Sequence, residues 1–228
     1  MIAAGEALIN TAKYSTLQIA LFSVGGAFCV VCYAAVLRGI AKYHVVEIPA
    51  AAVASNMAWE ITWALLYRTD LGVVFVWGYR TWLLLDVFIF GYLFLYGAQH
   101  VRNPALRRYF RPGLLAGTAC WVALLYFFVK EGYDTSTGLV TGYTATMIMS
   151  ALYLVMELVN LKPGQISTLA AWMRLLSNGL VSVFCFLVYP ELRFLLTLCV
   201  LTFILDCLNI VQLRRQLIPV LTPARASP

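Results

Sequence analysis

The sequence predicts an all-α integral membrane protein, a single bundle of seven transmembrane helices, and three observations lead to that prediction. Apolar residues make up 62% of the chain, charged residues only 11%, and the mean hydropathy is +0.84, whereas soluble domains carry about 25% charged residues. The apolar residues gather into seven runs, each close to the roughly 20 residues that a helix needs to cross a bilayer. Lysine and arginine fall mainly between the runs, where membrane topology places them.

Charged residues and helix breakers separate the seven runs. The predicted spans are residues 16–37, 47–67, 81–98, 113–129, 139–160, 167–188 and 192–212. Arg38 and Lys42 follow the first span, Arg68 and Asp70 follow the second, and a Lys-Pro-Gly break at 162–164 separates the fifth from the sixth. We therefore expect residues 1–228 to form one transmembrane domain without a large domain outside the membrane.

Two segments outside the spans need separate predictions. Residues 71–78 are apolar but too short to cross a bilayer, so a re-entrant or interfacial piece is expected there. The tail at 216–228 contains three prolines and is expected to be disordered.

The distribution of positive charge predicts the orientation. An odd number of spans puts the termini on opposite sides, and the face that includes the C-terminus carries ten basic residues against five on the other. The ten are Arg38, Lys42, Arg102, Arg107, Arg108, Arg111, Lys162, Arg214, Arg215 and Arg225, and the five are Lys13, Arg68, Arg80, Lys130 and Arg193. The positive-inside rule then places the C-terminus in the cytoplasm. The net charge of +6 is interpreted as this orientation signal, and no nucleic-acid partner is predicted.

Ionisable residues inside the predicted spans are the main functional signal, since each costs at least about 2.5 to 3.5 kcal/mol to insert. They are Glu60, Asp86, Glu157, Arg174 and Asp206. In a purely structural interpretation Arg174 pairs with Glu157 or Asp206, and the other carboxyl groups form hydrogen bonds between helices. Four carboxyl groups against one arginine nevertheless leave a surplus of acid, which must be protonated or hydrated.

Helical spacing places these residues among aromatic and polar neighbours. The candidate substrate-binding residues are Asn56, Trp59, Trp63, Trp82, Asp86, Tyr143, Tyr153, Glu157, Asn160, Arg174 and Asn209. A carboxylic acid buried among aromatic rings can keep its proton at neutral pH, and aromatic faces stabilise a cation. An acid, aromatic walls and a dry pocket are what a carbocation cyclase needs.

Two short motifs carry a resemblance to a known family. The second span reads Asn-Met-Ala-Trp-Glu at 56–60 and the last reads Leu-Asp-Cys-Leu-Asn at 205–209. With its length and seven spans, the chain resembles the small integral membrane terpene cyclases of meroterpenoid and indole-terpenoid pathways, the paxilline and pyripyropene type. The resemblance implies catalytic roles for Glu60 and Asp206 in a cyclisation that starts by protonation.

The resemblance also implies the kind of substrate and partner. The expected substrate is a linear prenyl chain or a prenylated aromatic or indole, with an epoxidised terminal alkene or a bare alkene, in functional coupling with a prenyltransferase and an epoxidase. The chain has no Asp-Asp-x-x-Asp motif, so neither a metal nor another cofactor is expected. Counted from the non-cytoplasmic ends of the predicted spans, Glu60 and Asp206 differ in depth by on the order of 10 Å, which leaves open whether both reach one epoxide.

Other functions remain as alternatives. A retinal protein needs a lysine in its last helix, and residues 192–212 contain none. A small proton-coupled transporter or a seven-helix receptor also fits buried carboxyl groups, although neither an internal repeat nor paired helix breaks are seen. Cys29 and Cys32 have C-x-x-C spacing but are interpreted as small buried hydrophobic residues, and a structural or partner-anchoring role is the remaining possibility.

Overall fold

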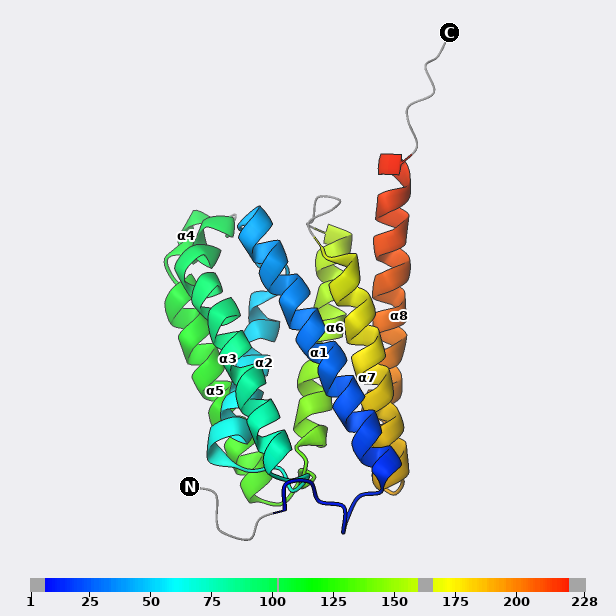
Figure 1. Ribbon diagram of the computed structural model, residues 1–228. Helices are drawn as coiled ribbons and strands as arrows, with labels where there is room; N and C mark the ends of the chain where they lie inside the picture. Colours follow the sequence, from blue (N-terminus) through cyan, green and yellow to red (C-terminus); the bar gives the residue numbers. More distant parts are fainter. Residues whose placement is uncertain (1–6, 102, 160–165, 222–228) are drawn as a thin grey trace.

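The computed structural model describes residues 7–101, 103–159 and 166–221, and within them the regular structure is entirely helical (Figure 1). Along the chain the helices are α1 (Thr16–Tyr43), α2 (Ala50–Ile61), the π-helix η1 (Thr62–Leu66), α3 (Val73–Tyr96), the 3-10 helix η2 (Gly97–His100), α4 (Pro104–Arg107), α5 (Phe110–Lys130), α6 (Leu139–Val159), α7 (Thr168–Val188) and α8 (Arg193–Leu221). Within the described chain, six helices are long and apolar enough to cross a membrane, namely α1, α3 with η2, α5, α6, α7 and α8. The long helices run alternately up and down one bundle (Figure 1).

Helix ends follow the local sequence. The Oγ of Ser15 accepts a hydrogen bond from the N–H of Gln18, whose side chain accepts one from the N–H of Ser15 at 2.8 Å, so a capping box starts α1. His44 ends α1 in the left-handed conformation (φ 55°). The side chain of Ser167 caps α7 by accepting from the N–H of Ala170 at 3.2 Å.

The second predicted span corresponds to α2 and η1, the shortest helical segment that runs through the bundle. Residues 47–67 were expected to form one α-helix, but α2 begins at Ala50, after Pro49, and passes into the π-helix η1 at Thr62. The N–H of Tyr67 reaches back to the Thr62 carbonyl at 2.8 Å and closes the wider turn. α2 packs against α3, α5 and α6, so the residues that it carries lie inside the bundle.

The expectation of a separate interfacial piece at 71–78 is wrong. Gly72 turns the chain with φ 118°, and Val73 begins α3, which continues without a break to Tyr96. The preceding N-terminal segment accepts a hydrogen bond from the first turn of this helix, because the N–H of Val73 donates to the carbonyl of Ala7 at 3.2 Å. The length of the run misled the prediction, since a helix can extend beyond the lipid that it crosses.

The last helix extends further than its predicted span. α8 continues to Leu221, so the backbone of residues 216–221, which were assigned to a disordered tail, is helical. Residues 222–228 lie outside the described chain, and the prediction for them stays a prediction.

Close contact between α1 and α7 depends on glycine. A Cβ at Gly25 would lie 2.8 Å from Cγ2 of Val181 and 3.2 Å from the carbonyl oxygen of Ser177. Small residues let helix backbones approach in membranes, where dispersion contacts replace the hydrophobic effect between helices. The two helices therefore form one tightly packed wall of the bundle.

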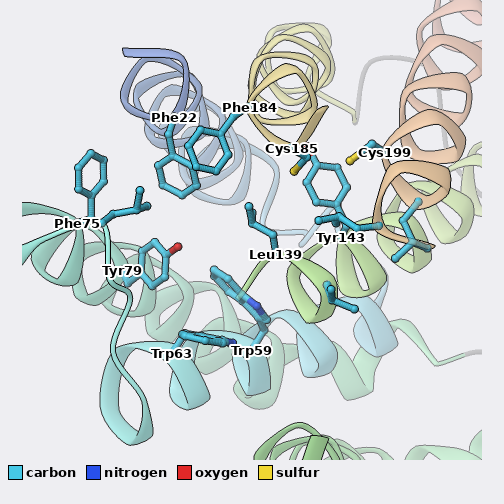
Figure 2. Packing of buried hydrophobic residues seen from close by; sticks show 14 of the residues in the cluster. Phe22, Trp59, Trp63, Phe75, Tyr79, Leu139, Tyr143, Phe184, Cys185 and Cys199 are labelled. Carbon is cyan, nitrogen blue, oxygen red and sulfur yellow. The ribbon is translucent and has the colours of Figure 1, made fainter. Parts of the chain in front are cut away.

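Aromatic side chains fill the bundle toward the end where α1 begins. Figure 2 shows the rings of Phe22, Tyr79 and Phe184 close together, with Trp59 projecting from α2 and Trp63 from η1. Phe22 meets Phe184 edge to face at 5.2 Å between ring centroids, and Trp59 meets Tyr79 at 5.4 Å. Such contacts add to the stability gained by burial.

A polar cluster closes this same end of the bundle. Asp70 accepts hydrogen bonds from Lys13 and from the hydroxyl of Tyr14, and its N–H donates to the carbonyl of Ser136 at 3.2 Å. Partial burial raises the pKa of Asp70, but the hydrogen bonds from Lys13 and Tyr14 outweigh it and hold that pKa below its ordinary value. The cluster ties the N-terminal segment to the α2–α3 and α5–α6 connections.

The start of α6 is held by a second carboxylate. Asp134 accepts hydrogen bonds from the N–H of Val140 at 2.9 Å and from the hydroxyl of Thr141. Burial raises the pKa of Asp134, while these hydrogen bonds oppose the rise. Asp134 is thus a helix cap and is not available to the interior.

Candidate active site

Two adjoining cavities lie between the helices. The first, which we call the polar cavity, has a volume of about 100 Å³, and its lining includes Glu47, Asn56, Asp86, Arg174 and Asn178. The second, the aromatic cavity, has a volume of about 110 Å³, and its lining includes Phe22, Trp59, Glu60, Tyr79, Trp82 and Tyr143. Cys29, Tyr33, Asn56, Thr146 and Asn178 line both, so the two cavities adjoin.

Glu60 lies in the wall of the aromatic cavity with one oxygen bound and one oxygen unpaired. It is 2% exposed. Its Oε1 accepts a hydrogen bond from the Tyr33 hydroxyl at 2.6 Å and one from Asn56 Nδ2 at 3.3 Å. Among the described residues its Oε2 has no hydrogen-bond partner. A buried polar atom without a partner is costly, and Glu60 belongs to the wall of the aromatic cavity.

Asp86 joins the same network through Asn56. The amide nitrogen of Asn56 donates to Asp86 Oδ2 at 2.7 Å and also lies 3.0 Å from the Tyr33 hydroxyl. Asp86 is 2% exposed and faces the polar cavity, whereas Glu60 faces the aromatic one. The two carboxyl groups therefore share neutral donors only, and two like charges held this way cannot both be ionised at low cost.

Asp206 has the opposite environment, because both of its oxygens are occupied. Its Oδ1 accepts from the Ser150 hydroxyl at 2.6 Å and from Arg174 Nε at 3.0 Å, and its Oδ2 accepts from Asn178 Nδ2 at 2.7 Å. Asp206 is 1% exposed and is absent from the lining of either cavity. Of the two pairings left open for Arg174, the structure places it on Asp206.

The guanidinium of Arg174 forms part of the wall of the polar cavity. It lies over the ring of Tyr153, 4.2 Å from the ring centroid, while its Nε binds Asp206. Asp206 thereby orients the arginine, whose remaining N–H groups give the cavity a planar cationic donor.

Asn178 connects the two carboxyl networks. It donates to Asp206 and lines both cavities, and the aromatic cavity that it borders is also bordered by Glu60. The predicted difference in depth therefore does not separate Glu60 and Asp206 into unrelated sites, although only Glu60 borders a cavity directly.

Aromatic residues from four helices, α1, α2, α3 and α6, line the aromatic cavity. Trp82 stacks on Tyr79 at 5.2 Å, with ring planes 22° apart, and the indole N–H of Trp59 donates to the carbonyl of Gly138 at 3.0 Å. The Tyr143 hydroxyl lies 2.9 Å from the Ser182 hydroxyl. Because the polar atoms of Trp59, Tyr79 and Tyr143 are hydrogen bonded within the protein, these side chains offer the cavity their ring surfaces.

Some predicted site residues lie elsewhere. Trp63 lines neither cavity, since it packs on Gly138 and its N–H points to Thr141 Oγ1 at 3.3 Å. Asn209 is fully buried and donates to the carbonyl of Ser150 at 3.1 Å, outside both linings. The backbone of Glu157 belongs to α6, but its side chain lies outside what is described, as does the whole of Asn160.

Four site residues were not among the predicted ones. Ser150 stands seven positions after Tyr143, and Asn178 stands four positions after Arg174. Each therefore shares a helical face with a predicted site residue, so a signal for both existed. Tyr33 gave none, because a tyrosine near the end of an apolar run is usually an interfacial residue. Glu47 was assigned to the edge of a span.

Glu47 lies between α1 and α2 and is 3% exposed. Its Oε2 accepts from the N–H of Ser167 at 2.7 Å, and among the described residues its Oε1 has no partner. Burial raises the pKa of Glu47 to about 7, and the Ser167 hydrogen bond and the charge of Arg174 oppose the rise. A carboxyl group with one bound and one unpaired oxygen therefore stands at one end of the polar cavity.

Neither metal ligands nor disulfides are found in the described part of the chain. No three histidine, cysteine or acidic side chains come together there as a metal site would require. Cys29 and Cys32 are free thiols in the lining of the polar cavity.

The apolar helices and the buried carboxyl groups define a multi-pass integral membrane protein with an interior site. The family model of the Pyr4-like transmembrane terpene cyclases matches residues 7–189, about four fifths of the chain. The chain belongs to this family, which confirms the resemblance found in the sequence. The match ends before α8, the helix that carries Asp206. No curated protein and no solved structure was found to match the chain.

Proposed function

We propose that this membrane terpene cyclase starts a carbocation cascade by protonating the terminal epoxide of a prenylated aromatic or indole substrate, and that Glu60 is the acid. One observation carries the proposal. Glu60 is a carboxyl group in the wall of an aromatic cavity, anchored through one oxygen while the other has no partner among the described residues. A proton on that free oxygen can be transferred without first breaking a hydrogen bond.

The hydrogen bonds of Asp206 support a different role for it. Three donors, one of them the guanidinium of Arg174, occupy its two oxygens. In this proposal Asp206 therefore orients Arg174 and Asn178 around the cavities through these hydrogen bonds. Glu60 is then the proton donor, and Asp206 is a positioning residue.

The chemical step conserves every atom. Glu60 gives its proton to the epoxide oxygen, the carbon–oxygen bond breaks toward a tertiary cation, and the next alkene attacks that cation to form a ring. The positive charge passes along the chain beside the faces of Trp59, Tyr79 and Trp82, which attract a cation. The cascade ends when a carbon loses a proton to the Glu60 carboxylate, which becomes the acid again, so the product is an isomer of the substrate.

We also propose the membrane arrangement. α2 and η1 together span residues 50–66, which is about 25 Å of helix and close to the roughly 30 Å hydrocarbon core, so they act as the seventh span. The C-terminus then lies in the cytoplasm by the distribution of basic residues. Fusion of a reporter that is active on one side of the membrane only, placed at either terminus, tests this arrangement.

The activity is tested with membranes that contain the protein. Epoxidised and non-epoxidised farnesyl and geranylgeranyl aromatic compounds are added, and liquid chromatography with mass detection searches for a new compound of unchanged mass. An isomer that forms from the epoxide and disappears with Glu60→Gln supports the proposal. An isomer formed equally well from the non-epoxidised compound shows direct protonation of an alkene, and no isomer from any substrate favours transport.

A further inference from the structure

The polar cavity has a chemistry that a hydrocarbon chain cannot satisfy. Its wall contains Glu47, Asp86, Arg174 and Asn56, while the wall of the adjoining aromatic cavity contains Phe22, Trp59, Tyr79, Trp82 and Tyr143. A polyene placed in the polar cavity would leave Oε1 of Glu47, which has no partner among the described residues, without a hydrogen bond, and that is unfavourable in a buried site. The two cavities are therefore suited to different parts of one molecule.

Glu47 and Arg174 give the polar cavity a defined pair of functions. The Oε1 of Glu47 is buried and has no partner among the described residues, whereas its Oε2 is held by the N–H of Ser167 at 2.7 Å. Arg174 is held through Nε by Asp206 and stacks on Tyr153. One fixed acceptor and one fixed planar donor thus line the same space.

We propose that the polar cavity is the subsite for the head group of the substrate, and that Glu47 selects heads that carry a hydroxyl or N–H donor. Arg174 binds an acceptor oxygen of the same head, and the prenyl chain extends into the aromatic cavity toward Glu60. This inference rests on the proposed cyclase function and adds the class of head group, a polar aromatic ring with both a donor and an acceptor. Glu47 lies at the end of the bundle where α1 ends and α7 begins, so the head occupies that end.

The hydrogen bond from the N–H of Ser167 makes the substitution Glu47→Gln a clear test of this role. The N–H of Ser167 requires an oxygen, so in Glu47→Gln the amide oxygen takes that contact and the NH₂ group replaces Oε1. The cavity then offers a donor where it had an acceptor, at nearly unchanged shape. Glu131→Gln is the matched control, because Glu131 is exposed at the opposite end of the bundle.

Binding is measured in nanodiscs at pH 8, above the pKa of Glu47 of about 7. The probes are farnesyl resorcinol and its dimethyl ether, both without the epoxide that the proposed reaction needs, and the signal is quenching of tryptophan fluorescence. We expect the wild-type protein to bind the resorcinol about tenfold more tightly than the ether, as for a hydrogen bond to a charged group. Glu47→Gln should lose this preference, and Glu131→Gln should keep it.

Equal affinity of the wild-type protein for the two probes would overturn the inference without any variant. The inference would also fail if Glu47→Gln kept the preference for the resorcinol over the ether and had a wild-type unfolding temperature. The cyclase proposal is tested separately with epoxidised farnesyl resorcinol. If an isomer forms and depends on Glu60 while Glu47→Gln changes no preference, only the head-group inference fails. If the preference depends on Glu47 but no epoxide is cyclised, the proposed reaction fails instead.

Discussion

Replacing Glu60 with glutamine removes the transferable proton but keeps the shape of the side chain. The amide oxygen can still accept from Tyr33 and Asn56, as Oε1 does at 2.6 and 3.3 Å, and no hydrogen bond is lost at Oε2, which has no partner among the described residues. The fold should therefore survive, with an unfolding temperature close to that of the wild-type protein. The rate of isomer formation should fall by about 10²- to 10⁴-fold, the usual contribution of a general acid.

Asp206→Asn provides the contrast, because it removes the counter-charge of a buried arginine. Breaking a buried ion pair on one side costs about 3 to 5 kcal/mol, so this variant should lower the free energy of unfolding as well as the activity. Both variants are assayed in the same membranes by mass-detected chromatography, and their thermal unfolding is followed in detergent. The reasoning is refuted if Glu60→Gln keeps more than about a tenth of the wild-type rate, or if Asp206→Asn is as stable as the wild-type protein and inactive while Glu60→Gln is active.

Three further predictions follow from contacts described above. Tyr33→Phe removes the 2.6 Å hydrogen bond to Glu60 and should lower kcat by about tenfold or more, measured by initial rates of isomer formation; an unchanged kcat would show that Tyr33 does not position the acid. Gly25→Ala places a Cβ 2.8 Å from a side chain of α7 and should destabilise the protein by about 1 to 3 kcal/mol, seen as a lower unfolding temperature; a wild-type value would mean that α1 moves away freely. Hydrogen bonds, chiefly from Lys13, lower the pKa of Asp70 despite its partial burial. The stability that the Asp70 carboxylate contributes is therefore fully present above the unfolded pKa of about 3.9, and it is lost as the pH falls through the lower folded pKa. Lys13→Ala should flatten that acid limb of the unfolding curve, and equal acid limbs in the two proteins would contradict the assignment.

Much of the fold follows from hydropathy. Six predicted spans fall on long helices, because a bilayer forces backbone polar groups to pair within a segment. The segment at 71–78 was misplaced, because counting against bilayer thickness cannot show that Val73 already continues into α3. The second span falls on α2 and η1 together, but no local sequence signal marked the change to a π-helix at Thr62.

The contacts inside the bundle are harder to predict from the sequence, because the position of a residue on a helical face does not show which residue of another helix it contacts. Spacing placed Glu60 and Asp206 on inward faces, but only the packed structure shows that one has a free oxygen and the other is fully hydrogen bonded. Trp63 shares a face with Trp59, yet the α5–α6 connection passes beneath it at Gly138. Tyr33 binds Glu60 across 27 positions of sequence, a contact that no periodicity can reveal.

The N-terminal segment described with the fold also bears on what a reactive cation can meet. Tyr14, which is 1% exposed, contacts the ring of Phe184, and that ring contacts Phe22 in the lining of the aromatic cavity. The segment that carries Tyr14 thus packs behind the wall of the aromatic cavity. In the proposed reaction a cation captured by water ends as an alcohol and leaves the cascade early, so this packing would keep the distribution of products narrow. Tyr14, which lines neither cavity, would then influence how many rings are completed before the charge is lost.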